Sequence, residues 1–251
     1  MNPINVSLFV FACAFGSALL GMFIKRLLPA HHVSSESKDV VRVAMGMVAT
    51  TVALVLGLLV YSAKSFYDTQ TAEVTQLAAN VVLLDRVLAH YGPESADVRA
   101  ELQRTIQRHL ETLWPDHDSR SSNAQYAAPN GEAIFDKIHA LIPKDDRQRS
   151  LQAQASSLAL QMGQTRLLML TQRSVPVPKL LLVMLVFWLI ALFISFGLFA
   201  PPNFTVVISL LVAAAAVCGA VFLMVEMYYP YGGLIQVSPA PLISALTQMG
   251  R

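Results

Sequence analysis

Charged side chains are scarce in this sequence of 251 residues, where Asp, Glu, Lys and Arg together make up 14%. Average soluble domains contain about 25% charged residues, so the composition favours a membrane protein. Hydrophobic residues make up 55% of the chain, and the mean hydropathy is +0.52. The net charge of +2 is small and no basic cluster is present, so we expect no nucleic-acid partner.

Cysteine is nearly absent as well. Cys13 and Cys218 lie in apolar runs without CxxC spacing, so we interpret them as packing residues rather than redox groups. The sequence also lacks a Gly-rich phosphate loop, a GxSxG motif and an HExxH motif. We therefore predict that the protein is not an enzyme and needs no cofactor.

Two histidine-containing segments give little support for a metal or proton site. Asp116–His117–Asp118 lies in a polar loop, and adjacent residues rarely converge on one ion, so we interpret it as solvated. His31–His32 could respond to pH, because the unperturbed pKa of histidine is about 6.5. An ordinary pair at the membrane surface is the favoured interpretation.

Four apolar runs are each long enough to cross a bilayer, which takes about 20 helical residues. They are Ile4–Ile24, Val43–Tyr61, Leu180–Ala200 and Val206–Val225. Basic residues follow the first run instead of preceding it, so we expect a retained anchor and not a cleaved signal peptide. We predict an all-α membrane protein with four transmembrane helices and a helical extramembrane domain between the second and third. The expected parts are a first helix pair at 1–62, a polar domain at 63–175, a second pair at 176–230 and a C-terminal tail at 231–251.

The polar domain shows helical periodicity. The second span is expected to continue as a helix to Gly92–Pro93, with an apolar seam at Val74, Leu77, Val81, Leu84, Leu88 and Tyr91. Ser95 is expected to cap a helix whose stripe is Val98, Leu102, Ile106, Leu110 and Leu113. A short amphipathic turn follows near Ile134–Leu141. A long helix from Asp145 toward Ser174 has a second seam at Leu151, Ala155, Leu158, Met162, Thr165 and Met169. The two seams can pair within one chain or between subunits.

The positive-inside rule gives a divided orientation. A short first loop inside, with both termini outside, is favoured by Lys25, Arg26, Lys38 and Arg42. The reverse is favoured by Lys64, Arg166, Arg173, Lys179 and Arg251. Charge alone slightly favours the first arrangement, because residues in long loops count for less.

The second span carries small residues with Thr50 among them, a composition that suits close helix packing or a pore. The candidate pore-lining residues are Met47, Thr50, Leu54, Leu58 and Tyr61. Close packing is the favoured cause, and Ala213–Ala216 with Gly219 suggests a similar face in the last span. Glu226 ends the last span at the membrane edge, where it is either a functional carboxylate or an ordinary interfacial one.

Several segments taken together resemble a known family. They are HHVSSESKDV at 31–40, VLGLL at 55–59, AKSFYD at 63–68, QLAAN at 76–80, LDRVLAHYG at 84–92, SFGLFAPPN at 195–203, Glu226, Pro230, GLIQVS at 233–238 and Pro241–Leu242. Apart from the loop around 116–131, the chain is similar throughout to the bestrophin-like family of bacterial membrane proteins, a group of largely undefined function.

The resemblance carries implications for assembly. The family's name reflects a distant likeness to bestrophins, which are pentameric anion channels with four spans and cytoplasmic helices between the second and third. It implies a homo-oligomer, a pentamer if the likeness extends that far, in a bacterial inner membrane, with the termini and polar domain cytoplasmic and the second span lining the pore. The second span departs from the aromatic residues expected of a bestrophin pore, because Met47, Thr50 and Leu54 occupy that region.

Two functional hypotheses follow. The first is an oligomeric ion channel whose second span lines the pathway, with Leu54 or Leu58 as a hydrophobic gate. The second is a non-conducting, membrane-anchored interaction or sensor module that assembles through its helical stalk.

Overall fold

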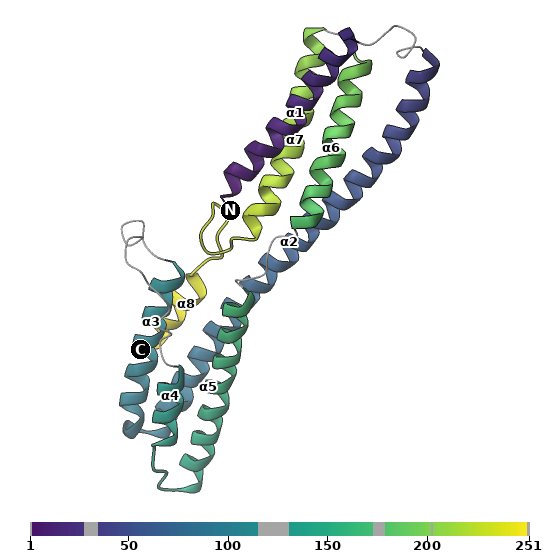
Figure 1. Cartoon of the computed structure of the whole chain (residues 1–251). Coiled ribbons are helices and arrows are strands. Elements are labelled where there is room, and N and C mark those ends of the chain that lie inside the picture. The colour runs from purple at the N-terminus through teal and green to yellow at the C-terminus, as the bar shows by residue number, and fades with distance from the viewer. Residues whose placement is uncertain (1, 28–34, 115–130, 173–178, 202, 250–251) are drawn as a thin grey trace. The chain divides into compact units, whose positions relative to one another are not determined.

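The computed structural model describes residues 2–27, 35–114, 131–172, 179–201 and 203–249 (Figure 1). Every regular element in these residues is helical. The elements are α1 (Pro3–Leu27), α2 (Ser35–Tyr91), the 3-10 helix η2 (Pro93–Ser95), α3 (Ala96–Leu113), α4 (Gly131–His139), α5 (Asp146–Gln172), α6 (Lys179–Phe199), α7 (Phe204–Met227) and α8 (Ala240–Met249). The predicted all-α membrane fold is confirmed, since α1, α2, α6 and α7 are long and apolar enough to cross a membrane.

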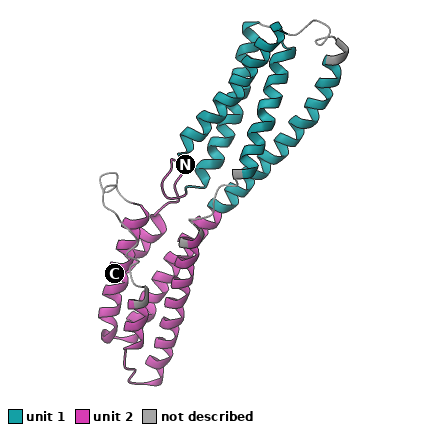
Figure 2. Ribbon diagram, viewed as in Figure 1, with its two compact units in different colours: residues 1–67, 176–229 teal, residues 68–175, 230–251 magenta. Residues whose placement is uncertain are grey.

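The helices form two compact units (Figure 2). Unit 1 contains residues 1–67 and 176–229, and unit 2 contains residues 68–175 and 230–251. α2 is one continuous helix whose first part belongs to unit 1 and whose second part belongs to unit 2. The C-terminal residues, which the sequence analysis treats as a tail, contain α8 and belong to unit 2.

In unit 1 the first and third spans run parallel. Val6 of α1 and Leu182 of α6 line one pocket near the starts of their helices, and Lys25 of α1 binds the carbonyl oxygen of Ala200 near their ends. α7 runs the opposite way, because the Cys218 thiol donates to the carbonyl oxygen of Ser7 at 3.1 Å (Figure 1). The unit therefore has two ends. We call the one formed by Lys25, Lys38, Ala200 and Phe204 the loop end, and the one formed by Pro3, Ser62, Leu182 and Tyr228 the Tyr228 end.

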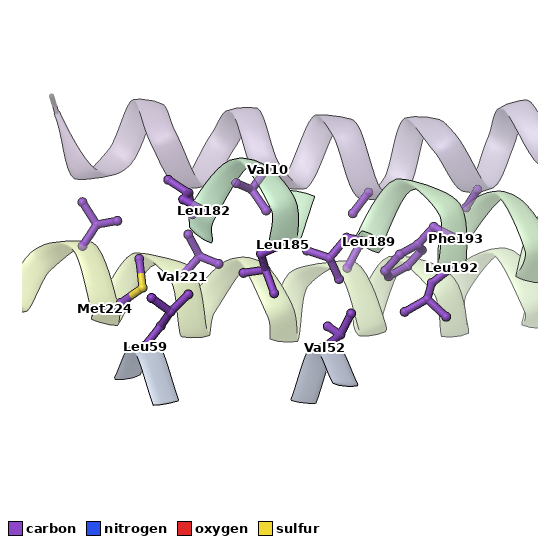
Figure 3. Close-up of a cluster of buried hydrophobic side chains, with 14 of the residues drawn as sticks. Val10, Val52, Leu59, Leu182, Leu185, Leu189, Leu192, Phe193, Val221 and Met224 are labelled. Carbon is purple, nitrogen blue, oxygen red and sulfur yellow. The ribbon is translucent and has the colours of Figure 1, made fainter. Parts of the chain in front are cut away.

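The core of unit 1 is an apolar cluster to which all four spans contribute (Figure 3). α6 supplies the largest share, with Leu182, Leu185, Leu189, Leu192 and Phe193. α1 contributes Val10, Ala14 and Ala18, α2 contributes Val52, Leu59 and Ala63, and α7 contributes Ala214, Val221, Met224 and Val225. In a bilayer this core is held by close packing instead of by water exclusion, because lipid tails are as apolar as the side chains.

In unit 2 the predicted seams are buried within the chain. All six residues of the first seam, from Val74 to Tyr91, are buried. In α5, Ala155, Leu158, Met162 and Met169 are buried, while Leu151 and Thr165 are partly exposed. Both seams are therefore used for packing inside one subunit.

The turn between α2 and α3 differs from the prediction in one respect. Gly92 ends α2 with a φ of 128°, a conformation that residues with a side chain rarely adopt. Ser95 precedes α3 but makes no side-chain cap. Its hydroxyl instead donates backward, to the carbonyl oxygens of Leu88 at 2.5 Å and Gly92 at 2.8 Å. The capping prediction for Ser95 is therefore wrong, because the closing turn of α2 offers nearer acceptors.

Candidate functional site

The span of α2 has two contrasting faces. Val52, Leu59 and Ala63 are buried in the core of unit 1. The five candidate pore-lining residues are all exposed: Met47 71%, Leu54 70%, Leu58 62% and Tyr61 72%, with Thr50 also exposed. At about 100° per helical residue, these five lie within an arc of roughly 80° on the side opposite the buried residues. We call this row the α2 stripe.

The polar groups of the α2 stripe have a defined hydrogen-bonding state. The hydroxyl of Thr50 donates to the carbonyl oxygen of Gly46 at 3.0 Å. Its proton is therefore used within the helix, and the oxygen lone pairs remain to accept a hydrogen bond. Such a hydroxyl suits water or a cation better than an anion.

The closest backbone packing among the glycines of the spans occurs between α1 and α6, and not at the glycines of α2 or α7. A Cβ atom built on Gly46, Gly57 or Gly219 would meet nothing within 4 Å. In contrast, a Cβ on Gly21 would lie 2.2 Å from the carbonyl oxygen of Ile194, and one on Gly197 would lie 2.0 Å from that of Ala18. Within one subunit the three glycines of α2 and α7 make no close helix contact, whereas Ala214 of the small-residue face predicted on α7 is buried in the core. The close glycine contacts are those at the crossing of α1 and α6.

Glu226, which the sequence places at the membrane edge, is buried. It is 2% exposed in the last turn of α7, beside the buried residues Met224 and Val225. The backbone nitrogen of Tyr229 donates to the carbonyl oxygen of Glu226 at 2.9 Å and closes the helix. The adjacent Tyr228 stacks on Phe66 with ring centroids 5.5 Å apart, and its hydroxyl lies 3.3 Å from the hydroxyl of Ser62. This part of the structure joins α7 to α2 at the Tyr228 end.

Unit 2 contains charge pairs that join elements distant in sequence. Arg99 of α3 forms a bidentate pair with Asp85 of α2, at 2.7 and 3.0 Å, and reaches the carbonyl oxygen of Met249 at 3.5 Å. The hydrogen bond that Arg99 donates to the Asp85 carboxylate raises the pKa of Arg99. Sequence reasoning missed this pair, because a separation of 14 residues leaves no local pattern.

A second cluster of charges surrounds Glu101 of α3. Lys137 of α4 donates to its carboxylate at 3.1 Å, and Arg104 and Arg108 pair with it at 3.0 Å each. The Lys137 hydrogen bond is the main cause that holds the pKa of Glu101 below its ordinary value. The carboxylate therefore links α4 to α3 as an anion.

Unit 2 also has a small cavity of about 40 Å³, lined mainly by apolar residues together with Thr105, His109 and Arg166. Burial lowers the pKa of Arg166. Among the described residues, no three His, Cys, Asp or Glu side chains gather as a metal site would require. His31–His32 and Asp116–His117–Asp118 lie outside the described residues.

A Bestrophin-like domain model matches residues 12–242. Two crystal structures of a bacterial Bestrophin homolog from Klebsiella pneumoniae, each with a single substitution, are similar in fold. One has a TM-score of 0.70 and the other 0.69, each at 12% sequence identity, with 96% of this chain and 97% of the other covered. No curated protein matches the sequence. Because the domain model covers most of the chain, this membrane protein belongs to the Bestrophin-like family.

Proposed function

We propose that this protein is an oligomeric ion channel in which α2 of each subunit lines a shared pathway. The single observation that carries the proposal is the α2 stripe, an exposed row of five residues on a span whose other side packs in the subunit core. A span that lines a pore needs such a second free face, because one face must hold it to its own subunit.

Leu54 and Leu58 are the proposed constriction. They are exposed on the α2 stripe one helical turn apart, and a ring of leucines can close a pore by excluding water. Thr50 lies one turn before Leu54 and offers an oxygen acceptor outward. This chemistry favours water or a cation at that position, and it does not supply the N–H donors that anion selectivity would use.

We assign the protein to the bacterial inner membrane as a homo-oligomer, with a pentamer as the expected stoichiometry. The Tyr228 end holds the start of α1, the end of α7 and the two points at which the chain leaves for unit 2. We assign this end of unit 1, where the chain continues into unit 2, to the cytoplasmic side. The family membership supports this arrangement.

Glu226 is proposed as a functional residue that fixes the end of α7 against α2. Its burial supports this role, because an ionisable group is costly at membrane depth and is retained where it serves a purpose. The neighbouring Tyr228 contacts with Ser62 and Phe66 lie on the same α2 helix that carries the stripe.

Thiol accessibility during conduction tests the channel directly. Cys13 and Cys218 are both free, and a chain with both changed to Ala provides the background. Leu54→Cys is introduced on the α2 stripe, and Leu8→Cys on α1 is the matched control, since Leu8 is also exposed, at 63%. In planar bilayers, a charged thiol reagent should block current through the Leu54→Cys protein and leave the Leu8→Cys protein unchanged. A folded oligomer that passes no current at any pH or calcium concentration contradicts the proposal.

The alternative is a non-conducting interaction or sensor module that assembles through its stalk. It is favoured by one observation: Leu160, Leu167 and Leu168 of α5 are exposed, although the seams of unit 2 are buried. Cysteine crosslinking at Leu160 in native membranes tests it. A crosslinked dimer together with absence of conduction supports the module, and a monomeric band in conducting protein excludes it.

A further inference from the structure

The loop end of unit 1 contains a pocket that none of the functions above uses. It has a volume of about 420 Å³ and lies where the start of α2, the end of α6 and the start of α7 meet. We propose that this pocket binds the phosphate headgroup of an anionic phospholipid. The inference rests on unit 1 alone and does not depend on whether the protein conducts ions.

The polar lining of the pocket is positively charged. Lys38 and Arg42 of α2 line it on one side, and the hydroxyl residues Ser195, Thr205 and Ser209 contribute from α6 and α7. Among the described residues that line it, none is a carboxylate. Asp39 follows Lys38 in the chain, and its contact with Arg42 is 3.9 Å long and mostly exposed, with both side chains more than 70% accessible. Such a pair is worth little in water and leaves Arg42 able to bind a phosphate.

A third cation lies beside the pocket. The ammonium group of Lys25 donates to the carbonyl oxygen of Ala200 at 2.7 Å, and Ala200 itself lines the pocket. This contact caps the end of α6, where the helix dipole is negative, and so it removes a partial negative charge from the pocket wall. The N-terminal turn of α7 lies on the other side, and its dipole adds a positive contribution.

The remaining lining is apolar, as acyl chains require. Phe196, Phe199, Met45 and Leu210 line the pocket on the membrane side of the cations. All of them belong to helices that cross the membrane, and the pocket lies where those helices end or begin. Basic pockets between spans at this depth are suited to lipid headgroups. The combination of two cations, three hydroxyls and an apolar floor fits an amphiphile with an anionic head better than it fits free phosphate.

The proposal also explains why the charge pattern gives a divided orientation. Lys25, Lys38 and Arg42 are among the residues that place the first loop on the cytoplasmic side by the positive-inside rule. In the structure Lys38 and Arg42 line one pocket, and Lys25 binds the carbonyl oxygen of Ala200, which also lines it. If these three residues are retained because they bind a lipid, their positive charge is not evidence for the side of the membrane on which the loop end lies.

The test uses the full chain purified in detergent. Lipid retention is measured by native mass spectrometry after addition of phosphatidylglycerol or of phosphatidylcholine, and thermal stabilisation is measured in parallel with inorganic phosphate. We expect selective retention of phosphatidylglycerol. The double variant Lys38→Gln/Arg42→Gln should weaken it roughly thirtyfold, from about fivefold for each cation lost near a membrane surface. Arg26→Gln is the matched control, since Arg26 lies at the same end, is exposed and does not line the pocket.

Several outcomes overturn the proposal. Equal retention of the two lipids excludes recognition of an anionic head. An equal loss in Arg26→Gln means that the attraction is a general surface effect. Stabilisation by inorganic phosphate as strong as that by lipid would make the ligand a free anion. If the double variant does not fold, Ser209→Trp fills the pocket without changing charge and should abolish selective retention, and unchanged retention in that variant contradicts the assignment.

Discussion

The crossing of α1 and α6 allows a sharp prediction about stability. In Gly197→Ala the new Cβ would lie 2.0 Å from the carbonyl oxygen of Ala18, so the two backbones must separate by about 1.4 Å to reach ordinary contact at 3.4 Å. No rotamer change can relieve a clash between a Cβ atom and a backbone atom. Overpacked interiors lose about 1–3 kcal/mol, and this site should lie near the upper value.

The measurement is thermal unfolding in detergent, followed by circular dichroism. At about 2–4 °C per kcal/mol for a chain of this length, a loss near 3 kcal/mol lowers Tm by roughly 6–12 °C. Gly57→Ala on α2 is the matched control, because its new Cβ meets nothing within 4 Å. Alanine has a better helix propensity than glycine by about 1 kcal/mol, so the control should keep or raise Tm. A Gly197→Ala protein that melts like the parent would refute the close crossing.

Three further predictions concern unit 2. Asp85→Asn removes a charge partner from the partly buried Arg99, and hydrogen exchange in α3 and α8 should rise as about 1–3 kcal/mol of local stability is lost. Gly92→Ala forces a side chain into a backbone region that is nearly exclusive to glycine, and it should cost about 1–3 kcal/mol in urea unfolding. The pKa of Glu101 lies below its ordinary value of 4.5 in the folded protein, so its stabilising contribution is present above that value and is lost as pH falls through the folded pKa. Glu101→Gln removes this titration, so the free energy of unfolding of the variant should fall less steeply than that of the parent as pH decreases below 4.5. An equally steep fall in both proteins would contradict the role of this carboxylate.

The spans and the long helices could be predicted from the sequence because their signals are local. An apolar run of about 20 residues requires a helix in lipid. Three of the four predicted runs fall within one helix, and the third, Leu180–Ala200, ends one residue beyond α6. The seam from Val74 to Tyr91 shows a helical period, and its burial follows from that period. The α2 stripe is predictable in the same way, because helical spacing alone places its five residues on one side.

Features that depend on distant residues could not be predicted. Gly16 and Gly21 both lie in α1, yet only Gly21 meets another backbone, and only the docking of α1 on α6 makes Gly21 and Gly197 contact points. The pair of Asp85 with Arg99 and the contact of the Trp114 indole nitrogen with the carbonyl oxygen of Val237, at 2.8 Å, each need tertiary structure. The burial of Glu226 is of the same kind, because the sequence shows only that a carboxylate follows an apolar run.

Unit 2 is built from two separate stretches of the chain, and this sets an order of events during biosynthesis. Residues 68–175 leave the ribosome before α6 and α7, whereas residues 230–251 follow them. Trp114 and Arg99 find their partners Val237 and Met249 only in the later piece. The polar half therefore waits, incompletely assembled, until the last two helices have been inserted into the bilayer, and correct insertion of those helices is a condition for finishing it.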